Sequence, residues 1–217
     1  MLNVRDIRCV RGGRTLFAGI SFTVAPGESL LLRGPNGIGK SSLLRMIAGL
    51  LPCASGHIEH EGEIALADEH PALDPDRRLR DALALWAHMD GATATQLDDA
   101  LARFALDRLA DVPVRMLSTG QRKRAGLART LAGGARLWLL DEPGNGLDTA
   151  SLNALGAAMD RHVAEGGAIV AASHLDLPHR FARAIDWTEV ARGGAGAGPS
   201  CDVISALPGV GAGCGCR

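Results

Sequence analysis

The chain has 217 residues, 47% of them hydrophobic, and a formal net charge of −1. This length and apolar content suffice for one domain with a substantial core, and the near-neutral charge argues against a polycationic nucleic-acid-binding protein. No segment approaches the ~18 consecutive apolar residues of a transmembrane helix, and the N-terminus lacks the apolar stretch of a signal peptide. We therefore expect a cytosolic protein, without a nucleic-acid partner, whose five cysteines stay reduced.

Several strands are predicted before and at the first glycine-rich loop. Residues 2–9 alternate apolar and polar, as a half-buried strand does, and 16–24 form a second strand region after a turn at 11–14. Ser29–Arg33 is a short apolar run typical of a buried strand, and 42–48 should be a helix that ends near Gly49. An antiparallel sheet is therefore expected to precede the loop.

The middle of the chain is predicted to be helical. Short strands at 57–59 and 63–67 are followed by a proline-rich, charged stretch at 71–78, which suggests a boundary into a different subdomain. Residues 79–131 then read as helix almost throughout, interrupted at Pro113. Two groups of apolar residues have helical spacing, namely Leu79, Leu83 and Trp86, and Leu97, Leu101 and Phe104. Trp86 and Phe104 are interpreted as core residues of this part.

The chain then returns to alternating strands and helices. The expected elements are a strand at 137–140, a helix at 151–164, a strand at 168–172, a short helix at 175–184 and a strand at 185–190. This alternation implies a parallel sheet that binds ligands at the carboxyl ends of its strands.

The last part of the chain is rich in glycine and alanine. We expect residues 193–217 to be mostly unstructured, with 203–207 as a candidate contact. Cys214 and Cys216 lie in this tail only one residue apart, so a disordered end is favoured over a metal or redox site.

A phosphate-binding loop is the most informative motif. Residues 34–42 fit G-x-x-x-x-G-K-[ST] between a predicted strand and a predicted helix, as the motif requires. The loop comprises Gly34, Pro35, Asn36, Gly37, Ile38, Gly39, Lys40, Ser41 and Ser42. Glycines let the backbone N–H groups approach an anion closely; Lys40 should reach the β- and γ-phosphates, and the Ser41 hydroxyl should bind Mg²⁺. A glycine-rich turn without a ligand is the alternative, and the strand–loop–helix context disfavours it.

Two carboxylates follow the strand at 137–140. Asp141 is placed to support Mg²⁺, and Glu142 to lie beside the γ-phosphate and polarise water. Alone, such a pair could equally cap the next loop. A phosphate loop upstream favours the catalytic interpretation.

A second candidate phosphate-binding segment forms the start of the helix after Leu117. Ser118 is a good N-cap, and Gly120 leaves the first turn open to a ligand, so the helix start is an anion site in its own right. Its alternative is an ordinary capped helix with a solvated basic face. In a chain that already has one phosphate loop, this helix end suggests a site that serves another subunit.

These motifs together resemble those of the ATP-binding cassette (ABC) ATPases. Residues 117–121 are similar to the LSGGQ signature, with Thr119 in place of the first glycine. The order also corresponds over roughly residues 2–190: phosphate loop, helical segment, signature, Asp-Glu pair, a D-loop at 145–148 and a switch histidine at His174. The resemblance implies an α/β cassette over 1–192, with a RecA-like P-loop core, an N-terminal antiparallel β subdomain and a helical subdomain at about 71–132.

The resemblance also implies roles for individual residues in an ATPase that converts ATP and water to ADP and phosphate. Two copies would enclose two ATP molecules, each between the phosphate loop of one copy and Ser118, Thr119, Gly120 and Gln121 of the other. Glu142 would be the general base, His174 would contact the γ-phosphate, and Asp148 would belong to the nucleotide-binding D-loop. Without the resemblance, His174 would be an ordinary strand-end histidine.

Two positions depart from the family pattern. Arg11 stands where an aromatic residue usually stacks on adenine, a contact that a guanidinium plane can also make. His70 stands where a glutamine usually links the nucleotide to the membrane partner. Both are kept as candidate nucleotide-site residues.

Within the family, the chain is most similar to the haem-exporter ATP-binding subunits of cytochrome c maturation. This rests on residues 14–22, the compact helical part and the short C-terminal region. It implies integral membrane permease partners of that system and a peripheral position on the cytoplasmic face of the inner membrane. The alternatives are the ATPase subunit of another small-molecule ABC transporter and a soluble ABC ATPase that acts in assembly.

Overall fold

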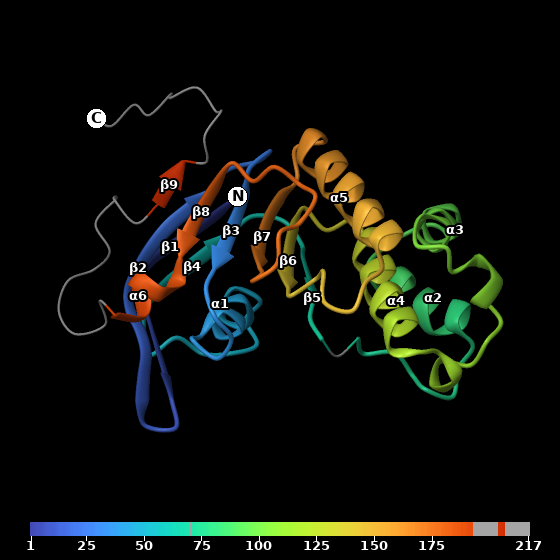
Figure 1. Cartoon of the computed structure of the whole chain (residues 1–217), viewed down its shortest axis with the longest axis horizontal. Coiled ribbons are helices and arrows are strands. Elements are labelled where there is room, and N and C mark those ends of the chain that lie inside the picture. The colour runs from blue at the N-terminus through green and yellow to red at the C-terminus, as the bar shows by residue number, and fades with distance from the viewer. Residues whose placement is uncertain (70, 193–203, 207–217) are drawn as a thin grey trace.

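Two sheets and a helical lobe make up the protein in the computed structural model, which describes residues 1–69, 71–192 and 204–206. Figure 1 shows the antiparallel sheet at one end of the molecule, the parallel sheet in the middle and the helical lobe at the other end. The fold is the expected α/β cassette, with an N-terminal antiparallel sheet, a parallel core and helices.

The antiparallel sheet has the strand order β2-β1-β4. It consists of β1 (Leu2–Arg11), β2 (Arg14–Val24) and β4 (Ser55–His60), and both partners of β1 run antiparallel to it. The predicted strands at 2–9, 16–24 and 57–59 are confirmed. The first two are longer than predicted because Arg11 pairs with Arg14, so the hairpin continues to its tip.

The larger sheet has the order β5-β6-β7-β3-β8-β9. Its strands are β3 (Ser29–Arg33), β5 (Ile64–Ala67), β6 (Leu137–Asp141), β7 (Ala168–Ala172), β8 (Arg183–Asp186) and β9 (Ile204–Ala206). Strands β5, β6, β7, β3 and β8 are parallel to one another, as predicted, whereas β9 is antiparallel to β8. The carboxyl ends of β3, β6 and β7 therefore meet at one edge, where the phosphate loop, the Asp-Glu pair and His174 follow them.

Both faces of the parallel sheet are buried, which explains its continuous apolar strands. Leu30 and Leu32 on β3 face one core, formed with the antiparallel sheet and α1 (Lys40–Ile47). Leu31 faces the other core, formed with the helical lobe and α5 (Thr149–Ala164). Because successive side chains of β3 point to opposite faces, one face of the sheet packs on the phosphate-loop helix and the other on the helical lobe.

The helical lobe contains α2 (Leu79–Met89), α3 (Ala94–Arg103) and α4 (Thr119–Ala132), with two short 3₁₀ turns at Asp107–Leu109 and Val114–Met116. The helical prediction is confirmed for these three helices, whereas residues 104–118 contain no α-helix. Phe104 is buried, as predicted, but Trp86 is only half-buried. Its Nε1 donates to the Ala72 carbonyl at 2.7 Å, and the Arg129 guanidinium lies 3.5 Å from its ring centroid. Trp86 therefore covers the edge of the lobe.

The predicted helix at 175–184 is wrong, because tertiary hydrogen bonds hold this segment as a loop. The Ser29 hydroxyl accepts the Ala182 N–H at 3.3 Å and lies 2.9 Å from His179 Nε2. On its other side the His179 ring lies 2.6 Å from Asp160 of α5. Pro178 also removes a backbone donor that a helix would need.

The predicted strand at 185–190 is also wrong beyond Asp186. The chain turns there into α6 (Trp187–Arg192). The Asp186 carboxylate accepts the Thr188 N–H at 2.8 Å, which is the bond of a helix N-cap. Apolar residues at 187 and 190 belong to one helical face, packed on the antiparallel-sheet side.

Of the tail at 193–217, the structure describes Ile204–Ala206, which pairs with β8. This strand falls within the predicted candidate contact at 203–207. The rest of the tail, with Cys201, Cys214 and Cys216, lies outside the described residues. Among the described residues, Cys9 is a buried and Cys53 a partly buried free cysteine.

Gly156→Ala is expected to destabilise the protein, although alanine is the better helix former by about 1 kcal/mol. A Cβ on Gly156 would lie 2.1 Å from the Pro178 carbonyl oxygen, so the loop that carries His174 would have to leave α5. We expect a fall in the free energy of unfolding of about 3 kcal/mol, the upper end of the usual cost of overpacking, measured by urea denaturation. The matched control is Ala157→Gly on the exposed side of α5, which should cost only about 1 kcal/mol. An unchanged midpoint for Gly156→Ala would contradict the close packing.

Candidate nucleotide site

The phosphate loop at 34–42 connects β3 to α1. Gly34, Gly37 and Gly39 have φ of 144°, 83° and 106°, and a Cβ on Gly34 would lie 2.6 Å from the Ile38 side chain. The N-cap of α1 is Gly39, and no side chain accepts a bond from the first turn. The backbone N–H groups at the start of α1 therefore remain available to an anion, and the helix dipole favours one there.

Lys40 is held under this loop by backbone oxygens. Its Nζ donates to the Gly34 carbonyl at 2.6 Å and to the Pro35 carbonyl at 3.0 Å, and the side chain is only 4% exposed. The ammonium also lies 3.5 Å from Glu142 Oε1. A buried cation is thus held at the loop, next to the carboxylate at the end of β6.

Ser41 and Asp141 meet although they are far apart in the sequence. The Ser41 hydroxyl donates to Asp141 Oδ1 at 3.0 Å. Burial raises the pKa of the Asp141 carboxyl, and the hydrogen bond from Ser41 partly opposes that rise. A hydroxyl beside a carboxylate suits a hard cation such as Mg²⁺. Among the described residues no cluster of three or more His, Cys, Asp or Glu side chains forms a cation cage, so a bound Mg²⁺ would take its other ligands from phosphate and water.

Glu142 is buried and its backbone is strained. Its φ of 46° is in the left-handed region, a conformation that costs a non-glycine residue about 1–3 kcal/mol and tends to occur at functional sites. Its Oε2 lies 2.8 Å from His174 Nδ1 and also accepts the His174 backbone N–H at 3.3 Å. Its Oε1 is buried without a hydrogen bond. Oε2 of Glu142 is therefore fixed by His174, whereas Oε1 has the Lys40 ammonium 3.5 Å away and no hydrogen bond.

Four of these residues, Lys40, Ser41, Asp141 and Glu142, line one cavity of about 350 Å³. His174 lines a separate cavity of about 240 Å³ with Gly34 and Pro35. Besides phosphate-loop residues, Asp141 and Glu142, the larger cavity is lined by Leu16, Arg45 and Glu69, which sequence reasoning did not select. Glu69 stands next to the proposed glutamine position. Arg45 forms a 3.6 Å ion pair with Asp68, and no local pattern in the sequence marks that pair.

Lys123 on α4 is another residue that the sequence analysis missed. Burial lowers the pKa of its ammonium, and nearby carboxylates, among them Glu69 and Asp141, oppose that shift. A cation from the helical lobe thus lies within electrostatic range of the nucleotide cavity. Only the folded structure shows this relation.

The signature residues lie apart from the phosphate loop of the same chain. Ser118 and Gln121 form a capping box: Gln121 N–H donates to Ser118 Oγ at 3.2 Å, and Ser118 N–H donates to Gln121 Oε1 at 2.8 Å. Thr119 and Gly120 line a different cavity, of about 760 Å³, together with Asn145 and Gly146. One chain therefore does not bring its signature onto its own phosphate loop.

The remaining candidates differ in position. Arg11 is exposed near the tip of the β1–β2 hairpin, and its charge opposes the rise that burial causes in the pKa of the Cys9 thiol. Asp148 caps α5 by accepting the Ser151 N–H at 2.8 Å, and this bonding lowers the pKa of its carboxyl. His70 lies outside the described residues. The roles of these three residues remain predictions.

Comparison with known proteins decides the family. The family described as ABC transporter matches residues 17–145, which is more than half of the chain. The chain belongs to the ABC transporter ATPase family. The resemblance seen in the sequence is therefore confirmed.

Curated relatives of this ABC ATPase extend over most of its length. A protein of Zymomonas mobilis is 54% identical over 81% of this chain and 79% of its own length. A protein of Novosphingobium aromaticivorans is 54% identical over 79% of this chain and 87% of its own. Each of the two is named "Cytochrome c biogenesis ATP-binding export protein CcmA".

Solved structures share the fold. An ATP-binding subunit of an ABC transporter is 26% identical, with a TM-score of 0.74 over 81% of this chain and 80% of its own. A dimeric ATP-binding cassette in a post-hydrolysis state with ADP and Pi is 20% identical, with a TM-score of 0.77 over 86% of this chain and 94% of its own, and supports the fold alone. No helix among the described residues is long and apolar enough to span a membrane.

Proposed function

We propose that this chain is the ATP-hydrolysing subunit of a membrane export complex of cytochrome c biogenesis, and that it drives the handling of haem. The observation that carries the proposal is the meeting of Lys40, Ser41, Asp141 and Glu142 at one cavity, with His174 bonded to Glu142 from outside it. The chain that carries this site is 54% identical to relatives named for cytochrome c biogenesis and export.

Nucleotide binding follows from the geometry of the phosphate loop. The N–H groups at the start of α1 bind the phosphates, and Lys40 exchanges the Gly34 and Pro35 carbonyls for phosphate oxygens. Ser41 and Asp141 would hold Mg²⁺, which would supply positive charge beside the phosphate oxygens. Arg11 stacks on the adenine.

Hydrolysis follows from the two oxygens of Glu142. His174 holds Oε2, so that Oε1 accepts a proton from water while the water oxygen bonds to the γ-phosphorus and the bond to the ADP oxygen breaks. Lys40, 3.5 Å from Oε1, stays beside the developing charge on the phosphate. The strained backbone of Glu142 keeps the carboxylate in this position.

Two copies complete each site. Ser118, Thr119, Gly120 and Gln121 of one copy, with Asp148 of the same copy, close over ATP held by the phosphate loop of the other. The separation of signature and phosphate loop within one chain supports this arrangement. Integral membrane subunits hold the dimer on the cytoplasmic face of the inner membrane, and His70 takes the position that links nucleotide to these partners.

A pull-down from detergent-solubilised native membranes tests the proposal. Tagged Glu142→Gln protein with ATP is expected to recover small integral membrane proteins of cytochrome c maturation, because stalled hydrolysis prolongs the assembled state. The matched control is tagged Lys40→Ala protein, which should recover fewer. Recovery of a different permease would keep the transport ATPase and reject the haem assignment. Recovery of soluble partners alone would favour an assembly ATPase.

A further inference from the structure

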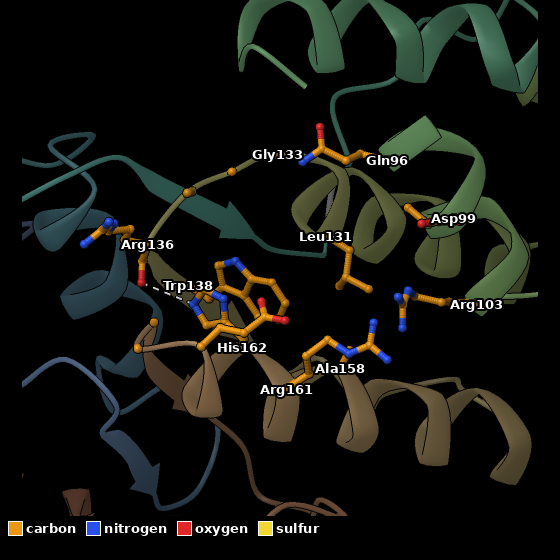
Figure 2. Close-up of a pocket in the computed structure, with 16 residues that line it drawn as sticks. Gln96, Asp99, Arg103, Leu131, Gly133, Arg136, Trp138, Ala158, Arg161 and His162 are labelled. Carbon is orange, nitrogen blue, oxygen red and sulfur yellow. Dashed lines mark hydrogen bonds between the residues drawn. The ribbon is translucent and has the colours of Figure 1, made fainter. Parts of the chain in front are cut away.

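A second cavity, of about 330 Å³, lies at the end of the parallel sheet opposite the phosphate loop. It is bordered by α3, by the segment that leads from α4 into β6, by the C-terminal half of α5 and by the turn before β7 (Figure 2). It shares no lining residue with the nucleotide cavity. Its volume is within the range of small-molecule sites, which often lie where two parts of a protein meet.

One wall of this cavity is a fixed aromatic stack. The Trp138 indole lies on the His162 imidazole with 3.9 Å between ring centroids and 9° between planes. His162 is held in turn by a 3.2 Å hydrogen bond to the Arg136 carbonyl. A Cβ on Gly167 would lie 2.3 Å from the His162 ring, so this position must be glycine for the stack to form.

The indole nitrogen of this wall has no acceptor. Trp138 is 5% exposed, and its Nε1 is buried without a hydrogen-bond partner. Figure 2 shows this nitrogen on the side of the ring that faces Gly133, another lining residue, and away from the bond between His162 and Arg136. Buried donors are almost always paired, so an acceptor from outside the protein is expected here.

The opposite side carries two exposed arginines. Arg103 of α3 and Arg161 of α5 both line the cavity, and Figure 2 shows their guanidinium groups near Leu131 and Ala158. Within the described part of the chain, neither guanidinium takes part in an ion pair or a side-chain hydrogen bond, so both are hydrated by solvent. The lining holds three arginines (103, 136 and 161) and two carboxylates (Asp99 and Glu165), a net charge of +1.

We propose that this cavity binds a small organic anion. Its carboxylate lies between Arg103 and Arg161, its apolar body lies against Leu131 and Trp138, and a further oxygen accepts the indole N–H. Paired guanidinium groups are suited to a carboxylate, and the aromatic wall to an apolar body. A buried water could satisfy the indole alone, and bulk water solvates both exposed guanidinium groups while the cavity is empty. The anion replaces that water at all three groups. Because α3 belongs to the helical lobe and α5 to the sheet, the ligand ties these two parts together.

The three tryptophans make the test specific. Trp187 Nε1 donates to the Ile38 carbonyl in the phosphate loop, and Trp86 Nε1 donates to Ala72 in the helical lobe. Trp138, whose Nε1 has no partner, lines this cavity. Indole N–H resonances of the ¹⁵N-labelled full chain thus report three places at once. Trp138→Phe assigns the signal of interest and keeps an aromatic ring on His162.

The probe is 2-naphthoate, a flat apolar body with one carboxylate. We expect saturable movement of the Trp138 resonance alone, and at least about tenfold weaker binding in Arg103→Gln/Arg161→Gln. The control Arg108→Gln removes one exposed charge from the same lobe and should bind as the unchanged protein does. Movement of the Trp187 resonance instead would place the probe at the phosphate loop and overturn the proposal. An unmoved Trp138 resonance, or equal affinity in the double variant, would overturn it as well.

Discussion

Lys40→Ala is expected to weaken ATP binding by about 100-fold. The Lys40 ammonium lies under the phosphate loop, where its present partners are the carbonyls of Gly34 and Pro35 at 2.6 and 3.0 Å. Phosphate oxygens would replace these neutral acceptors with charged ones, and hydrogen bonds to charged groups contribute about 1.5–3 kcal/mol each. Losing roughly 3 kcal/mol corresponds to about two powers of ten in the dissociation constant. Isothermal titration with ATP and Mg²⁺ measures it.

The control for this variant must separate charge from position. Arg108→Ala removes one exposed positive charge far from the loop and should leave the affinity for ATP unchanged. The substitution also takes the cation away from the buried Glu142 carboxylate, which could unfold the site. Circular dichroism therefore has to show that Lys40→Ala is folded. If folded Lys40→Ala binds ATP as tightly as the unchanged protein, Lys40 does not contact the phosphates.

Glu142→Gln is expected to lower the rate of ATP hydrolysis by about 10²–10⁴-fold while ATP still binds. Glutamine has the same shape and keeps an oxygen for His174, but its amide cannot accept the proton of the attacking water. The phosphate loop is unchanged and Lys40 keeps its bonds to the Gly34 and Pro35 carbonyls, so a dimer with ATP should accumulate. Single-turnover hydrolysis gives the rate, and gel filtration with ATP detects the dimer.

One control variant and two contrary outcomes test this result. Glu59→Gln changes an exposed carboxylate on β4, whose ion pair with Arg5 is 3.7 Å long, and should hydrolyse ATP normally. Normal turnover by Glu142→Gln would remove Glu142 from the role of general base. Loss of both binding and turnover would indicate instead that the buried Lys40–Glu142 pair is needed to keep the loop folded.

The fold-level predictions succeeded where a segment carries its own signal. The apolar run at Ser29–Arg33, the glycines after it and Lys-Ser at the helix start describe a strand, a loop and a helix with no reference to the rest of the chain. Ser118 and Gln121 likewise form their capping box within one helical turn. Local hydrogen bonding and backbone geometry decide such elements, so they can be predicted from sequence.

The predictions failed where distant contacts compete with local preference. The segment at 175–184 has apolar residues spaced as in a helix, but bonds from Ser29 and Asp160 to His179 hold it as a loop. Trp86 has core spacing, yet its indole donates to Ala72 at the edge of the lobe. Neither contact can be recognised from the residues next to His179 or Trp86 in the sequence.

The sequence by itself determined the family, the parallel core and the residue types available for phosphate, metal and water, because each motif is a short run with its own chemistry. Only the tertiary structure decided how they meet: Ser41 with Asp141, Lys40 with Glu142, and Oε2 of Glu142 with His174. It also revealed Lys123 near the carboxylates that line the nucleotide cavity, and the unpaired indole of Trp138 at a second cavity. Burial and distance produce these relations, and both arise only when strands and helices far apart in the chain pack together.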